Sequence, residues 1–203
     1  MKKLLPVAAL AFALMTACGT PPGQLSANNR VSIGVAAGDS GSVETATKTV
    51  TPATEDAPEK ISWTITPGKG VTFTFMTRPG SDAAYITGYR ILEEKLYTAE
   101  GTTTNSGGSI NKMDVYLTSG YSCTERTALR SCTANDTDIR PDNGVPAQHS
   151  IYLESGLGNL ARATDADVTQ VTSIEFIGTS SNGAPVSVKV AGIVSSGNRA
   201  GDE

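Results

Sequence analysis

The chain of 203 residues contains a single histidine, His149, which limits the chemistry that its side chains can support. Histidine-rich metal centres need several imidazoles, so a multi-histidine metal site is excluded. A lone imidazole can act as a general base, but only within hydrogen-bond reach of a nucleophile. We expect His149 to lie at a strand edge, and a catalytic role is the alternative.

The tetrad Gly38-Asp39-Ser40-Gly41 resembles the segment around the nucleophile of trypsin-like serine proteases. In those enzymes the catalytic histidine and aspartate precede the serine, whereas His149 follows it here. Glycine, serine and aspartate are also typical turn residues. We therefore expect a turn at this tetrad and assign no catalytic residue.

The acidic loop at residues 135–144 contains three carboxylates, Asp136, Asp138 and Asp142, whose hard oxygen atoms suit calcium. Arg140 stands where a further ligand would be wanted. The loop is thus either a weak calcium site or, as we expect, a solvated polar loop, and no cofactor is predicted.

Tyr85, Thr87, Tyr89 and Ile91 alternate along one strand-like segment and would share one face of it. Exposed tyrosines can stack on sugar rings or pack against a partner protein. Because Ile86 is the main apolar side chain on the opposite face, burial of Tyr85 and Tyr89 in the core is favoured over a binding face.

Cys18 follows Lys2, Lys3 and an apolar stretch at residues 4–17. This stretch is shorter than the roughly 18 residues of a spanning helix and fits the apolar part of a signal peptide. The segment ending Leu14-Met15-Thr16-Ala17-Cys18 resembles a bacterial lipoprotein signal, and an ordinary secretory signal is the alternative.

This resemblance implies that residues 1–17 are removed and that Cys18 receives acyl chains. The mature protein would then be an extracytoplasmic, membrane-anchored lipoprotein. Gly19, where an aspartate would indicate the inner membrane, favours the outer membrane or cell surface.

Lipid on Cys18 leaves two cysteines, Cys123 and Cys132, in an oxidising compartment. Their spacing is too long for a C-x-x-C redox motif, and a zinc site would need further ligands. We predict a structural disulfide, which closes a short loop and stabilises the fold by about 2–3 kcal/mol.

The signal holds two of the 16 basic side chains and none of the 20 acidic ones, so the mature net charge is about −6. A nucleic acid would be repelled at long range, so none is expected as a partner. The expected partners are the membrane, through the lipid on Cys18, and envelope proteins or glycans.

Alternating apolar residues indicate two β-hairpins. Residues 61–65 and 71–75 are predicted to pair, with Trp63 opposite Phe73 in the core. Residues 174–176 and 186–190 are predicted to pair around a three-residue loop at 181–183 that sets Phe176 opposite Val188. Shorter strand signals occur at residues 31–36, 43–50, 84–92, 113–118 and 150–154. Short helices are expected at residues 92–97 and 157–163, and a long flexible loop at 98–111.

The segment Tyr85-Ile86-Thr87-Gly88-Tyr89-Arg90-Ile91 resembles the third strand of a fibronectin type III or related immunoglobulin-like domain, with residues 71–75 as the second strand. This resemblance and the strand count imply an all-β immunoglobulin-like sandwich of seven to nine antiparallel strands after a signal helix. The expected order is a signal peptide at 1–17, a lipidated cysteine and tether at 18–30, the sandwich at 31–194 and a disordered tail at 195–203.

The resulting expectation is a lipid-anchored envelope protein whose non-catalytic sandwich binds or scaffolds other envelope components. The alternatives are a carbohydrate-binding module that uses the tyrosine stripe, and a secreted hydrolase with an unrecognised site.

Overall fold

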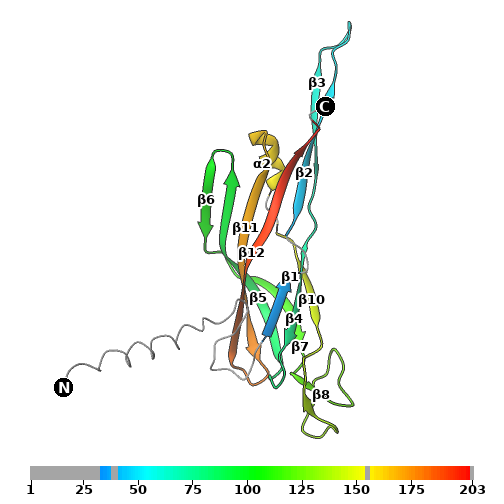
Figure 1. The fold of residues 1–203 in the computed structure, drawn as a ribbon, viewed down its shortest axis with the longest axis vertical. Helices are drawn as coiled ribbons and strands as arrows, with labels where there is room; N and C mark the ends of the chain where they lie inside the picture. Colours follow the sequence, from blue (N-terminus) through cyan, green and yellow to red (C-terminus); the bar gives the residue numbers. More distant parts are fainter. Residues whose placement is uncertain (1–32, 38–40, 154–155, 202–203) are drawn as a thin grey trace, which may run out of the picture.

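The computed structural model describes residues 33–37, 41–153 and 156–201, which form an all-β fold with one short helix (Figure 1). The expected signal peptide, Cys18 and the tether lie outside the described residues. The elements are β1 Ile33–Ala37, β2 Val43–Thr51, β3 Lys60–Thr66, β4 Val71–Thr77, β5 Ala84–Thr98, β6 Gly101–Ser106, β7 Asn111–Leu117, β8 Tyr121–Ser122, β9 Arg140–Pro141, β10 Ala147–Ile151, α2 Leu157–Thr164, β11 Val168–Ser180 and β12 Pro185–Ala200.

Two sheets face each other in the lower half of Figure 1 and form an immunoglobulin-like β-sandwich. One sheet has the order β1-β4-β10, and the other places β12, β11 and β5 side by side, with β7 on β5. The first, second and fifth strands of such a sandwich share one sheet, and the third, sixth and seventh share the other. The predicted second and third strands, β4 and β5, accordingly lie in different sheets.

Phenylalanine side chains fill the centre of the sandwich. The ring of Phe176 on β11 meets Phe73 and Phe75 of β4 edge to face, with ring centroids 5.0 and 4.9 Å apart. All three side chains are fully buried. Because β4 and β11 belong to opposite sheets, these contacts join the two layers.

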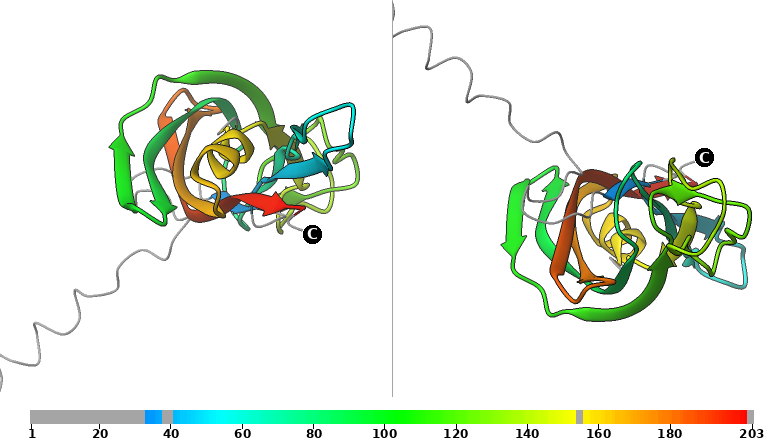
Figure 2. Two further views of the ribbon diagram at one scale, coloured as in Figure 1. Left: turned by 90° about the horizontal axis from the view of Figure 1, so that it is seen from above. Right: turned by 90° about the horizontal axis from the view of Figure 1, so that it is seen from below.

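The large sheet continues beyond the sandwich, because β5, β11 and β12 are 13 to 16 residues long. In this upper part β6 pairs with β5, and β2 pairs with both β12 and β3. The sheet curls around α2, as Figure 2 shows from above. Leu157 and Ala161 of α2 and Val168 of β11 form a second small core there.

The predicted hairpin of β11 and β12 is confirmed in its register. Phe176 lies opposite Val188, and Ile174 lies opposite Val190. Gly183 in the connecting loop has φ +82°, the left-handed conformation that a three-residue loop of this kind requires.

The predicted hairpin of residues 61–65 with 71–75 is wrong. β3 pairs with β2, whereas β4 pairs with β1 and β10 in the other sheet. Residues 67–70 therefore cross between sheets instead of forming a hairpin turn. Trp63 is only half buried on β3 and is not a core residue.

Four other predictions about chain organisation are corrected. Residues 92–97 are not a helix but the continuation of β5, and residues 98–111 include β6 instead of a flexible loop. The expected disordered tail contains the end of β12, which pairs with β2 through residue 200. This β12–β2 pairing is parallel, so the strands are not all antiparallel. The helix predicted at 157–163 is confirmed as α2.

Replacing Phe176 with alanine should lower the free energy of unfolding by about 3–5 kcal/mol, because it opens a cavity where both sheets meet. Chemical denaturation of the variant measures this loss. Leu129→Ala, at a side chain that is 85% exposed, is the control and should change stability by less than about 0.5 kcal/mol. Equal losses in the two variants would contradict the proposed packing.

Candidate functional site

The predicted disulfide between Cys123 and Cys132 is confirmed, with a Cα–Cα distance of 5.9 Å. It closes a loop at the lower end of the molecule in Figure 1, next to the short β8–β9 pair. We call residues 121–141 the disulfide lobe. Arg126 of this lobe donates from Nη1 to the carbonyl oxygens of Tyr121 and Asn143 and so ties the base of the loop together.

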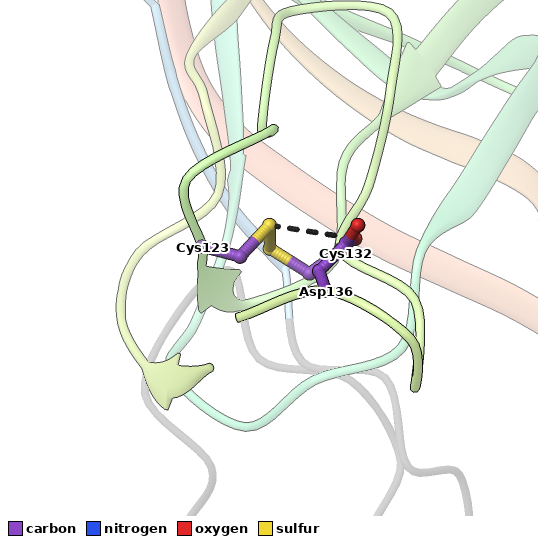
Figure 3. A group of neighbouring side chains, drawn as sticks. All are labelled: Cys123, Cys132 and Asp136. Carbon is purple, nitrogen blue, oxygen red and sulfur yellow. Dashed lines mark hydrogen bonds between the residues drawn. A yellow bond between two sulfur atoms is a disulfide. The ribbon is translucent and has the colours of Figure 1, made fainter. Parts of the chain in front are cut away.

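Asp136 lies directly beside the disulfide, as Figure 3 shows, and one of its carboxylate oxygens lies within 4.8 Å of both sulfur atoms. Cys123 Sγ approaches Asp136 Oδ2 to 3.7 Å, marked by the dashed line. A disulfide sulfur carries no hydrogen and is not a thiolate, so this is a packing contact and not a metal centre.

The carboxylate of Asp136 is instead occupied by hydrogen bonds. It accepts the backbone N–H of Thr133 at 2.7 Å and Nη2 of Arg130 at 2.7 Å. The Thr133 amide, followed by Arg130, holds the pKa of Asp136 below its ordinary value of 3.8. Asp136 therefore fixes the conformation of the lobe.

The three candidate calcium ligands do not converge. Asp142 forms an ion pair with Arg126, with 3.6 Å between Oδ2 and Nη2, and accepts the N–H of Asn143. Asp138 is an exposed turn residue with φ +56°. Within the described part of the chain, Asp136 clusters with the two cysteines and not with these carboxylates. The geometry fits the solvated polar loop that we expected from the sequence.

His149 lies half buried on β10, opposite Phe73 of β4 and at the edge of the three-stranded sheet, which fits the expected strand-edge position. The residues Gly38, Asp39 and Ser40 of the protease-like tetrad lie outside the described residues.

A shallow depression lies beside Ile91 and Glu94. Its volume of about 110 Å³ is well below the roughly 300–1,000 Å³ of small-molecule sites.

Tyr85 and Tyr89 do not share one face of β5. Gly88 pairs with Ile177 of β11, and Ile86 pairs with Gly178, so Thr87 is an extra residue in a β-bulge. The bulge changes which side the following residues face. Tyr89 packs against the core, with its ring centroid 6.3 Å from that of Phe176, and burial raises the pKa of Tyr89. Tyr85, in contrast, is 46% exposed on the outer face of the sheet.

The outer face pairs Tyr85 with a different tyrosine, Tyr116 of β7. Their ring centroids are 4.8 Å apart, and the two residues are direct cross-strand neighbours. Tyr116 Oη lies 2.7 Å from Ser131 Oγ of the disulfide lobe, and Ser131 Oγ also accepts the N–H of Ser119. The lobe thus holds one ring of the pair in place.

Apolar side chains continue this surface next to the tyrosines. Ile110 Cγ2 and Ile177 Cγ1 lie over Gly88, at 2.9 and 3.6 Å from the position that a Cβ there would take. Ile110 is 58% exposed. We call Tyr85, Tyr116, Ile110 and Ile177 the aromatic surface.

The sequence offered a signal for Tyr116, because the apolar residues Met113, Val115 and Leu117 alternate around it. All three are buried, and because successive side chains of a strand point to opposite faces, Tyr116 lies on the outer face. Its partnership with Tyr85 depends on strand pairing and could not be derived from either segment alone.

Comparison with known protein families and with curated protein sequences finds no match to this chain. In the described ranges, no helix has both the length and the apolar character needed to cross a membrane. The class of the protein is therefore defined by its fold, an immunoglobulin-like β-sandwich with an added disulfide lobe.

The lowered pKa of Asp136 predicts that its contribution to stability is present above about pH 3.8 and is lost as the pH falls through its lower folded value. Arg130→Gln should raise the pKa of Asp136 toward its ordinary value, because it removes a cationic donor. An NMR titration of side-chain carboxyl groups measures this. The control Arg140→Gln removes an exposed arginine whose Nε bonds to Ser122. Equal shifts in both variants would contradict the assigned cause.

Proposed function

We propose that this protein is a lipid-anchored protein of the bacterial envelope whose sandwich binds other envelope proteins and performs no chemistry. The anchor is inferred from residues 1–18 alone. The binding role depends on one observation, the aromatic surface on the outer face of the large sheet.

The composition of this surface favours a protein partner. Tyrosine rings are enriched in protein interfaces because they bury a large apolar area and lose little conformational entropy. Here aliphatic Ile110 and Ile177 lie over Gly88, on the same strand as Tyr85. Ser131 fixes the ring of Tyr116, which lowers the entropy cost of binding.

Carbohydrate binding is the second candidate, and the Tyr85–Tyr116 pair is the observation in its favour. Exposed Tyr85 and half-buried Tyr116 can stack on the apolar faces of sugars, while Thr87 and Thr179 nearby are exposed residues with hydroxyl groups. Exposed aliphatic side chains contribute little to sugar stacking, so Ile110 distinguishes the two candidates.

The anchor is tested by producing the full chain and its Cys18→Ser variant in a Gram-negative host. We expect wild-type protein in the membrane fraction, starting at Cys18 and carrying the mass of at least two acyl chains, since a single chain gives only marginal anchoring. Cys18→Ser should lose that mass and leave the membrane. Ser26→Ala, in the predicted tether, should behave as wild type. A mature N-terminus other than Cys18 would refute the anchor.

The binding surface is tested by crosslinking in native membranes. Tyr85→Ala should reduce the yield of specific crosslinked protein at least about tenfold, because exposed aromatic anchors dominate interfaces. Tyr97→Ala is the matched control, on the same strand and similarly exposed at 42%. Binding to envelope polysaccharide is measured with the same variants. A Tyr85-dependent loss in polysaccharide binding alone identifies the second candidate, and unchanged yields in both assays refute the surface.

A further inference from the structure

The strand β3 forms a free edge of the large sheet. The sheet runs β3-β2-β12-β11-β5-β6, and within residues 33–37, 41–153 and 156–201 β3 pairs only with β2. In Figure 1 the β2–β3 hairpin projects at the end of the molecule opposite the disulfide lobe. The outward backbone groups of β3 are therefore available to a further strand.

This edge has few of the features by which proteins prevent edge pairing. The seven residues of β3 contain no proline, and the register with β2 is continuous from Lys60 to Thr66 without a bulge. Lys60, at one end, is its only charged residue. The opposite edge, β6, has the polar sequence GTTTNS. Long, unprotected edges of this kind are pairing surfaces.

The apolar residues of β3 are arranged symmetrically. Ile61, Trp63 and Ile65 point to one side, and Ser62 and Thr64 to the other. Ile61 is 51% exposed and Trp63 is half buried. The order isoleucine, tryptophan, isoleucine is the same in both directions from Trp63.

We propose that β3 pairs antiparallel with β3 of a second copy of this chain, around a two-fold axis at Trp63. In this register Trp63 faces its own counterpart, Ile61 faces Ile65 of the second copy, and Ser62 faces its Thr64. Every central pair is apolar against apolar or polar against polar. Such self-complementarity is what a two-fold interface requires, and cross-strand aromatic and β-branched pairs stabilise it.

The helix α2 supports the apolar side of this interface. Ile65 packs beside Gly158 of α2. Ile61 of the second copy therefore packs against Ile65, which α2 covers, and not against open solvent. The row formed by Ile61, Trp63 and Ile65 becomes continuous across both copies.

Charges at the hairpin tip are also complementary in this register. The tip between β2 and β3 carries Glu55, Asp56 and Glu59, all exposed. Antiparallel pairing around Trp63 brings the tip of one copy toward exposed Lys69 of the other. The attraction favours this register over a shifted one.

The test measures self-association of the purified full chain in detergent by analytical ultracentrifugation. The wild type should form dimers. Ile61→Lys should raise the dimer dissociation constant at least about tenfold, since an ammonium group would be buried against isoleucine twice per dimer. Val50→Lys is the matched control, because Val50 is the cross-strand neighbour of Ile61 on β2, 40% exposed but one strand from the seam. A monomeric wild type, or equal effects of the two variants, overturns the proposal.

The register is tested by oxidative crosslinking. Ser62→Cys and Thr64→Cys chains, mixed, should give a covalent dimer, because directly opposed strand residues have Cα atoms about 4.5–5.5 Å apart, within reach of a disulfide. Each variant alone should crosslink at least about tenfold less, since its cysteines are then diagonal neighbours. Equal yields in the mixture and the separate samples overturn the two-fold register.

Discussion

The edge-to-face contact of Phe176 with Phe73 and Phe75 is the interaction on which the architecture depends. Among the described residues no backbone ladder joins β4 to the strands of the large sheet, so contacts between side chains across the core hold the two layers together. The rings lie at the centre of the main core, surrounded by aliphatic side chains from both sheets. Exposed parts of the fold, including the aromatic surface and the β2–β3 hairpin, are positioned relative to this core.

Bulges allow one set of long strands to serve two cores. On β11, alternate residues from Val168 to Phe176 are all buried, first under α2 and then in the sandwich. The two strands that pair with β11 contain bulges, in which they have one residue more than β11. β5 has extra residues at Thr87 and near Leu92, and β12 has one near Gly192, where φ is +78°. Each bulge adds twist, and the upper sheet curls around the helix (Figure 2).

Several polar side chains that the sequence offered for chemistry make structural contacts. The two described cysteines are joined, Asp136 and Asp142 are bound to arginines, and Ser131 supports Tyr116. The same lobe therefore stabilises the outer face that we propose for binding. The edge of β3 lies at the other end of the molecule, so partner binding and self-association need not compete.

The sequence by itself determined the alternation of buried residues in β4, β11 and β12, the β11–β12 hairpin and the Cys123–Cys132 disulfide. These features depend on side-chain period and on short separations, where turn geometry or loop closure limits the choices. Only the tertiary structure decided that β3 leaves β4 for β2, that residues 92–97 extend a strand, and that Tyr85 pairs with Tyr116 while Tyr89 turns inward. Alternation defines a face but not a partner, and one bulge at Thr87 reverses the faces after it. The choice of pairing partner and the position of a bulge both depend on neighbouring strands that are distant in the sequence.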